Sequence, residues 1–156
     1  GMPHLHFCTY GYSSLYYDEE SVGGECSQFG FEMTFRLATK LPPPDDQYWW
    51  VLNLLNNLAR YVFKTGRWFE PFHWLQANGP IRADYPTDLV GLAFALDPVL
   101  APVETPHGRV EFVQAFGITG SELESIKSNS VTCEEVIESH RRGNALLITD
   151  LDRRGH

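Results

Sequence analysis

The pattern of hydrophobic and polar positions predicts one strand with particular clarity. Between Phe29 and Leu37, apolar side chains occupy every second position, and Glu32, Thr34 and Arg36 stand among the positions between them. A period of two is typical of a strand with one apolar and one polar face. Five further strands are predicted: one ends near Glu104, and the others lie at His4–Tyr12, Leu89–Leu96, Arg109–Phe116 and Ala145–Asp150.

Two features characterise the later strands. Leu89–Leu96 is an almost unbroken apolar run bounded by aspartates, which is typical of a strand buried on both faces. Thr105–Gly108 has proline in its second position and glycine in its fourth, which favours a tight turn. This turn would join Arg109–Phe116 to a strand that ends near Glu104.

Helical spacing predicts one long helix at about Gln47–Lys64, after a proline run that cannot continue a strand. Asp45 or Asp46 would supply its N-cap. The apolar residues that recur at helical spacing are Val51, Leu55, Leu58 and the pair Tyr61-Val62. We expect this stripe to pack against the sheet.

Two T-x-x-E capping boxes predict two short helices near the end of the chain. Thr119 with Glu122 would begin a helix at Gly120–Ser128, and Thr132 with Glu135 one at Cys133–Arg142. Strands that cluster, with helices inserted among them, indicate an α+β fold. We predict a mixed, largely antiparallel sheet packed against one long and two short helices.

Length and composition are consistent with one domain. A chain of 156 residues with 43% hydrophobic content can bury a substantial core, so we assign residues 2–156 to one domain and interpret Gly1 as a tag remnant. The densest apolar run is too short to span a bilayer. Cys8, Cys26 and Cys133 are odd in number and widely spaced, which fits reduced thiols. We therefore expect a cytoplasmic protein.

The net charge of −8 is unevenly distributed. No Lys or Arg precedes Arg36, although five acidic residues do, and residues 83–108 form a second stretch with acidic but no basic residues. Such stretches disfavour nucleic acid and anionic membranes as partners and favour a basic protein or peptide. Acidity that merely maintains solubility explains the pattern equally well.

Several residues have metal-binding or catalytic potential. His4, His6 and Cys8 would lie on one face of a strand, but a zinc site needs a further ligand and none follows nearby in sequence. Asp150 with Asp152, and Ser139 with His140, lack supporting context. Hydrogen-bonded histidines beside a sheet explain the first group better, so we expect no metal or other cofactor. A metal-dependent enzyme using His4/His6 or Asp150/Asp152 stays as the alternative function.

The polar face of the Phe29–Leu37 strand needs partners. Glu32 and Arg36 are about 13 Å apart along a strand, so they cannot pair with each other. A buried network that sets strand register explains Glu32, Thr34 and Arg36 better than a ligand site, and Arg60 and Tyr61 could contribute to it.

Five blocks of sequence resemble the Suppressor of fused (SUFU) family, in that family's order. The strand Phe29–Leu37 is close to the family's hallmark strand, and the match extends over nearly the whole chain. The other blocks are His4–Phe7 with Tyr10–Tyr16, Leu58–Phe63, Thr105–Gly108 with Val110, Phe112 and Gln114, and Leu147–Asp150. The resemblance implies the fold of the family's N-terminal domain and places Glu32, Thr34, Arg36, Arg60 and Asp150 in structural motifs.

The resemblance also implies a protein-binding role. In eukaryotic members, a peptide adds as a strand in a groove between this domain and a second one, and Tyr61 matches a tyrosine of that groove. An acidic residue of the groove has no clear match here, although Glu70 and His73 stand near its position. Taken as a stand-alone domain, the chain resembles the bacterial form of the family, whose members are proposed to be immunity proteins that neutralise toxins. Partner identity and oligomeric state are not implied.

These considerations predict a partner site. Its candidate residues are Tyr61, Trp68, Phe69, Glu70, Phe72, His73 and Trp74. We expect one or two of the four rings in Trp68–Trp74 to be exposed beside an unpaired strand edge, since aromatic residues are frequent interface anchors. The alternative is that these rings only close the core over the long helix.

Overall fold

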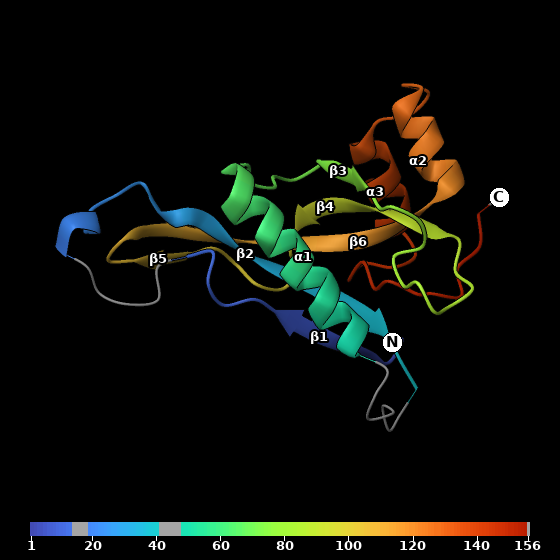
Figure 1. The fold of residues 1–156 in the computed structure, drawn as a ribbon, viewed down its shortest axis with the longest axis horizontal. Coiled ribbons are helices and arrows are strands. Elements are labelled where there is room, and N and C mark those ends of the chain that lie inside the picture. Colours follow the sequence, from blue (N-terminus) through green and yellow to red (C-terminus); the bar gives the residue numbers. More distant parts are fainter. Residues whose placement is uncertain (14–18, 41–47, 156) are drawn as a thin grey trace.

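A mixed six-stranded sheet forms the centre of the fold (Figure 1). The computed structural model describes residues 1–13, 19–40 and 48–155. The strand order is β1–β2–β6–β4–β3, and β5 pairs with the first part of β6. The strands are β1 (His4–Cys8), β2 (Cys26–Ala38), β3 (Trp74–Gln76), β4 (Leu89–Leu96), β5 (Val103–Thr105) and β6 (Gly108–Thr119). The helices are η1 (Glu19–Ser21, 3₁₀), α1 (Trp49–Thr65), α2 (Gly120–Lys127) and α3 (Cys133–Arg141).

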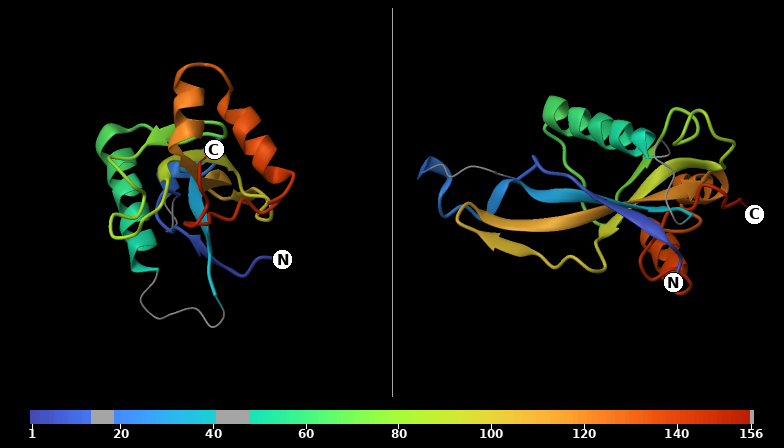
Figure 2. Two further views of the ribbon diagram at one scale, coloured as in Figure 1. Left: turned by 90° about the vertical axis from the view of Figure 1, so that its right-hand side faces the viewer. Right: turned by 90° about the horizontal axis from the view of Figure 1, so that it is seen from below.

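The two longest strands, β2 and β6, lie side by side and are parallel, whereas the other pairs of named strands are antiparallel. Helix α1 covers one face of the sheet, and α2 and α3 lie on the other face (Figure 2). The predicted α+β fold with a mixed, largely antiparallel sheet is therefore confirmed.

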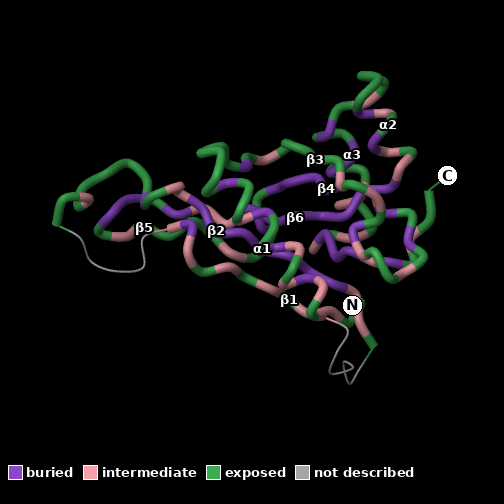
Figure 3. Tube along the Cα trace, viewed as in Figure 1, coloured by how far each residue is buried: buried purple, intermediate pink, exposed green. Residues whose placement is uncertain are grey.

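The core under α1 follows the predicted alternation. Phe31, Met33 and Phe35 of β2 are buried there together with the apolar stripe of α1, namely Val51, Leu55, Leu58 and Val62. Figure 3 shows buried residues along β2, β6 and β4. The opposite face is buried as well, because the even-numbered residues 32–36 are covered too.

Helix α1 begins close to the predicted position. Tyr48 occupies its N-cap without a side-chain hydrogen bond, and the predicted caps, Asp45 and Asp46, lie outside the described residues. The helix ends at Gly66, whose φ of 71° suits glycine and whose N–H donates to the carbonyl of Val62 at 2.8 Å.

Both capping boxes are formed. The Thr119 hydroxyl accepts from the N–H of Glu122, whose carboxylate accepts from the N–H of Thr119, and Thr132 and Glu135 form the same pair of bonds. The hairpin between β5 and β6 is also as predicted. Gly108 has a φ of 114° there, and a Cβ would lie 2.5 Å from the Gly24 carbonyl oxygen, so only glycine fits.

Two predicted strands differ from the structure. The prediction of a strand at Ala145–Asp150 is wrong: only Thr149 pairs, as an isolated bridge with Leu37. The Asn144 side chain bonds both the N–H and the carbonyl of Ile148, and Leu147 has a φ of 50°, so the backbone turns instead of extending. The first strand ends at Cys8 and not at Tyr12, because the chain then turns towards Glu32.

None of the helices in the described ranges is long and apolar enough to cross a bilayer.

Candidate functional site

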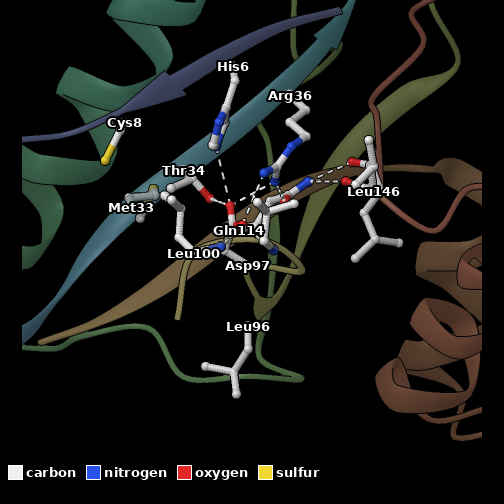
Figure 4. A network of polar contacts seen from close by, with 12 residues as sticks. His6, Cys8, Met33, Thr34, Arg36, Leu96, Asp97, Leu100, Gln114 and Leu146 are labelled. Atoms are coloured by element: carbon white, nitrogen blue, oxygen red, sulfur yellow. Dashed lines mark hydrogen bonds and ion pairs between the residues drawn. The ribbon is translucent and has the colours of Figure 1, made fainter. Parts of the chain in front are cut away.

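The polar face of β2 is part of a buried network centred on Asp97, which directly follows β4 (Figure 4). Arg36 donates from Nη1 to Oδ2 of Asp97 at 2.7 Å and from Nη2 to Oδ1 at 3.0 Å, and the Thr34 hydroxyl donates to Oδ2 at 2.7 Å. His6 of β1 approaches the same carboxylate, with Nε2 3.3 Å from Oδ2. The network thus joins β1, β2 and the end of β4.

Asp97 is held ionised by this arrangement. Burial alone would raise its pKa, but the hydrogen bonds from Arg36, from the Leu100 N–H and from Thr34 outweigh burial and hold the pKa well below its usual value. Because the folded protein favours the charged form, the network stabilises the fold at neutral pH and weakens when acid protonates Asp97.

Gln114 of β6 connects the network to the segment that follows α3. Its Oε1 accepts a bond from Arg36, and its Nε2 donates to the carbonyls of Leu146 and Leu147 at 2.9 and 2.7 Å. Thr149 continues the connection by donating its N–H to the Arg36 carbonyl. Asp150 lies in the turn that follows, where its Oδ1 accepts from the N–H of Asp152.

Glu32 has a separate set of partners. Its carboxylate accepts bonds from the Thr9 hydroxyl, the Gly11 N–H, and both the N–H and hydroxyl of Ser13, at 2.6–3.0 Å. Glu32 and Arg36 therefore each have their own partners, as their separation along the strand requires. Arg60 and Tyr61 do not reach either set, because both are exposed on α1, which covers the opposite face.

These contacts explain most of the sequence blocks as structural. The Tyr10–Ser13 segment binds Glu32, while His6, Thr34, Arg36 and Gln114 meet around Asp97. Sequence reasoning missed Asp97, which it treated as the polar boundary of a strand. The signal was an aspartate immediately after a strand buried on both faces, where its side chain can reach an inward-facing arginine.

The residues considered and rejected as metal ligands make other contacts in the structure. His4 Nδ1 lies 3.0 Å from the Met2 carbonyl oxygen, and the Cys8 thiol lies 3.5 Å from the Thr9 carbonyl oxygen. Over residues 1–13, 19–40 and 48–155, no three His, Cys, Asp or Glu side chains are placed to share a metal ion. His140 bonds Glu122 at 2.5 Å and is not paired with Ser139 in any described contact.

We predict that the protein purified without added metal contains no stoichiometric zinc. A chelator should leave its Tm unchanged, because a structural zinc contributes folding free energy directly. Elemental analysis and thermal melts with and without EDTA would measure this. One equivalent of tightly bound zinc, lost in His4→Ala or His6→Ala, would contradict it.

The other candidate residues gather in one open groove. Tyr61, Trp68, Phe69, Glu70, Phe72, His73 and Trp74 all line a hollow of about 530 Å³, together with Gly66, Arg67 and Leu75. The hollow lies between the end of α1 and β3. All seven residues assigned to a partner site from sequence are therefore brought together.

A column of stacked rings supports the groove. Tyr61 stacks on Phe69, with ring centroids 5.8 Å apart, and Phe69 stacks on Phe94 of β4 at 4.2 Å. Phe69 is buried, so it closes the core as the alternative interpretation requires. Tyr61 is the outer end of this column and is 37% exposed.

The remaining rings are open to solvent. Trp68, Phe72 and Trp74 are 53%, 37% and 40% exposed, so three rings are exposed where one or two were predicted. Phe72 adopts a φ of 68°, a left-handed conformation uncommon for a residue other than glycine, while its N–H bonds the Phe94 carbonyl. The segment that carries these exposed rings is hydrogen-bonded to β4.

Glu70 is oriented by its neighbours. Trp68 donates from Nε1 to Glu70 Oε1 at 3.1 Å, and His73 Nε2 lies 3.6 Å from Glu70 Oε2. The Glu70 N–H also donates to His73 Nδ1 at 3.3 Å. Glu70 and His73, which stand near the position of the family's acidic groove residue, are therefore in direct contact with each other.

A strand edge borders the groove. β3 is the last strand of the sheet and pairs with β4 in the order Trp74↔Ala93, Leu75↔Leu92 and Gln76↔Gly91. The Ala77 N–H donates to the Val90 carbonyl and the Phe94 N–H to the His73 carbonyl. Since hydrogen-bonded residues alternate along an antiparallel pair, the backbone groups of Trp74 and Gln76 point away from β4.

Comparisons with known proteins agree with the sequence blocks. The family described as Suppressor of fused protein (SUFU) matches residues 1–154. The Suppressor of fused homologs of Homo sapiens and Mus musculus are each 34% identical over 159 residues, which cover 96% of this chain. The chain spans about a third of the length of these curated relatives (32%).

Two crystal structures share the fold. The Sufu–Fu complex superposes with a TM-score of 0.85 at 30% identity, over 98% of this chain and 69% of that chain. Drosophila Suppressor of Fused gives a TM-score of 0.82 at 29% identity, over 99% of this chain and 39% of that chain. The resemblance found from sequence is confirmed.

Proposed function

Because the chain belongs to the Suppressor of fused family, we propose that it is a non-catalytic domain that binds a protein partner in the aromatic groove. The observation that carries this proposal is the groove itself, where exposed rings lie beside the outer edge of β3, with which no described residue pairs. One of the similar structures is a complex of Sufu with Fu, which supports a protein as the partner.

The partner would add a strand beside β3. Trp74 and Gln76 offer backbone groups at the free edge, and a bound strand would bury the exposed rings of the groove. Aromatic rings bury a large area with few rotatable bonds, which makes Tyr61, Trp68 and Trp74 suitable anchors.

Charge around the groove favours a basic partner. A neighbouring hollow of about 310 Å³ shares Trp68, Phe69 and Glu70 with the groove and is also lined by Glu25, Glu111 and Arg109. Arg109 Nη2 lies 3.3 Å from Glu111 Oε1, so it is partly neutralised. Across the two hollows, three carboxylates (Glu25, Glu70 and Glu111) stand against two guanidinium groups (Arg67 and Arg109). This small acidic excess favours a basic protein.

We therefore propose a basic toxin as partner, with this chain as its immunity protein. A toxin gene directly upstream of the gene for this chain, and the toxin itself recovered by pull-down from the source cell, would support the role. An acidic partner that binds in the same groove would contradict the immunity role while leaving the binding function intact.

Tyr61→Ala is expected to weaken binding of the recovered partner by about tenfold or more, because it removes an exposed anchor and uncovers Phe69. Isothermal titration calorimetry would measure Kd, and Tyr61→Phe should restore most of the affinity. Tyr10→Ala removes a more exposed ring outside the groove, and Arg141→Ala changes a distant charge, so both should bind normally.

Unchanged affinity in a folded Tyr61→Ala variant would exclude the groove as the binding site. The comparisons give no support to the alternative of a metal-dependent enzyme at His4/His6 or Asp150/Asp152.

A further inference from the structure

The opposite edge of the sheet is formed by β1 (Figure 1). The Thr39 N–H donates to the Pro3 carbonyl and the Thr9 N–H to the Met33 carbonyl, so the odd-numbered residues of β1 face β2. By the same alternation, the N–H and carbonyl groups of His4, His6 and Cys8 point away from the sheet. No residue in the described ranges pairs with this edge.

This edge lacks the features that usually prevent association. Exposed edge strands commonly carry Lys, an internal proline or a bulge. β1 has the sequence HLHFC, contains none of these residues, and pairs with β2 in an unbroken register. Such an edge is a template for another strand.

We propose that two copies of this chain associate through antiparallel pairing of their β1 strands about a two-fold axis at His6. This surface is distinct from the aromatic groove and does not depend on the proposed function. Pairing in this register places His4 opposite Cys8 of the second copy and Leu5 opposite Phe7 of the second copy. The two sheets then become continuous.

The register is self-complementary. Leu5 and Phe7 are half-buried on the face covered by α1, so each two-fold-related pair joins an aliphatic and an aromatic side chain on the apolar side. Trp49 of α1 is exposed, and it stacks on Tyr48, which lies beside Phe7 with ring centroids 6.4 Å apart. These rings extend the apolar contact beyond the strands.

Charge favours a second copy over the basic partner proposed for the groove. The chain carries a net charge of −8, but residues 1–17 contain no Asp, Glu, Lys or Arg. Burial, followed by the nearby charge of Arg36, lowers the pKa of His6, so the rings that meet near the axis are neutral at pH 7. An edge strand without Asp, Glu, Lys or Arg neither repels its copy strongly nor attracts a basic partner.

The expected dimer is weak. A five-residue strand pair buries less than the roughly 1,200 Å² typical of stable interfaces, even with the flanking rings. Sedimentation equilibrium of the full chain should therefore show a dimer fraction that rises with protein concentration. A wild-type protein that stays monomeric at every accessible concentration would overturn the proposal.

Proline at outward-facing positions tests the edge directly. His4→Pro and Cys8→Pro each remove an N–H that does not bond β2, so the fold should persist while dimerisation weakens about tenfold or more. His4→Ala and Cys8→Ala are the matched controls and should dimerise normally. If the proline variants dimerise as well as their alanine controls, the dimer uses another surface and the proposal fails.

A disulfide tests the register. In a Cys26→Ser background, His4→Cys should form oxidised dimers in high yield, because the new thiol faces Cys8 of the second copy within reach of a disulfide. Adding Cys8→Ser should abolish this cross-link. Equal cross-linking in both variants would exclude the proposed register.

Discussion

Arg36→Met is expected to destabilise the protein by about 3–5 kcal/mol, because it leaves the Asp97 carboxylate buried without its main ionic partner. Arg36 is 2% exposed and contacts both carboxylate oxygens of Asp97 as well as Gln114. Chemical denaturation followed by circular dichroism would measure the change. Arg36→Lys should recover only part of the loss, since an ammonium group cannot reproduce the two-pronged contact.

The stability that the Arg36–Asp97 pair contributes should depend on pH in a defined direction. The pKa of Asp97 is lowered in the folded state, so its contribution is complete above the usual carboxyl pKa and is lost as pH falls below it. The difference between wild type and Asp97→Asn should accordingly shrink on acidification. A difference that stays constant from neutral pH to strongly acidic pH would show that Asp97 is not the ionised centre of the network.

Phe31→Ala and Leu55→Ala should each cost about 2–5 kcal/mol, since both side chains are buried where β2 packs against α1. Phe31 also stacks on Tyr12 with ring centroids 4.8 Å apart. A loss of this size threatens a marginally stable domain. Thermal melts would show it as a marked fall in Tm.

Val99→Ala is a suitable control for these core variants. Val99 is an aliphatic residue that is mostly exposed, so its truncation should change stability little. Melts in which Phe31→Ala or Leu55→Ala is as mild as Val99→Ala would contradict the strand–helix core.

The buried polar residues and the exposed rings of the groove need to be tested by different measurements. Changes at Arg36, Asp97 or Glu32 should reduce partner binding only by unfolding the protein, because these side chains are buried in the sheet. Changes at Tyr61 or Trp74 should reduce binding while Tm stays close to wild type, because these rings are exposed. Measuring affinity and Tm together therefore separates the scaffold from the proposed site.

Local patterns were sufficient for most elements. The alternation at Phe29–Leu37 and the run Leu89–Leu96 correspond to β2 and β4, because side-chain periodicity follows directly from strand geometry. The capping boxes at Thr119 and Thr132 were equally reliable, since their hydrogen bonds join residues only three positions apart. The seven residues predicted as a partner site line one groove, and their binding role stays a prediction. Tyr61 was chosen from the family resemblance, and the aromatic residues of 68–74 were chosen because such rings are frequent interface anchors.

Long-range contacts decided the rest. Ala145–Asp150 has the composition of a strand, but the bonds of Asn144 and Gln114 to its backbone leave it a single bridge. Asp97 lies 61 residues from Arg36 in sequence, so no local pattern could reveal their pairing. The number of exposed rings likewise depended on how the segment 68–74 packs against α1 and β4, as the stacking of Phe69 between Tyr61 and Phe94 shows. Sequence by itself determined the family, the fold class and the periodic elements, because these depend on motifs and on the spacing of residues that are close together in the chain. Only the tertiary structure decided which polar residues are buried together and which strand edges have no partner among the described residues, because both depend on segments distant in the chain.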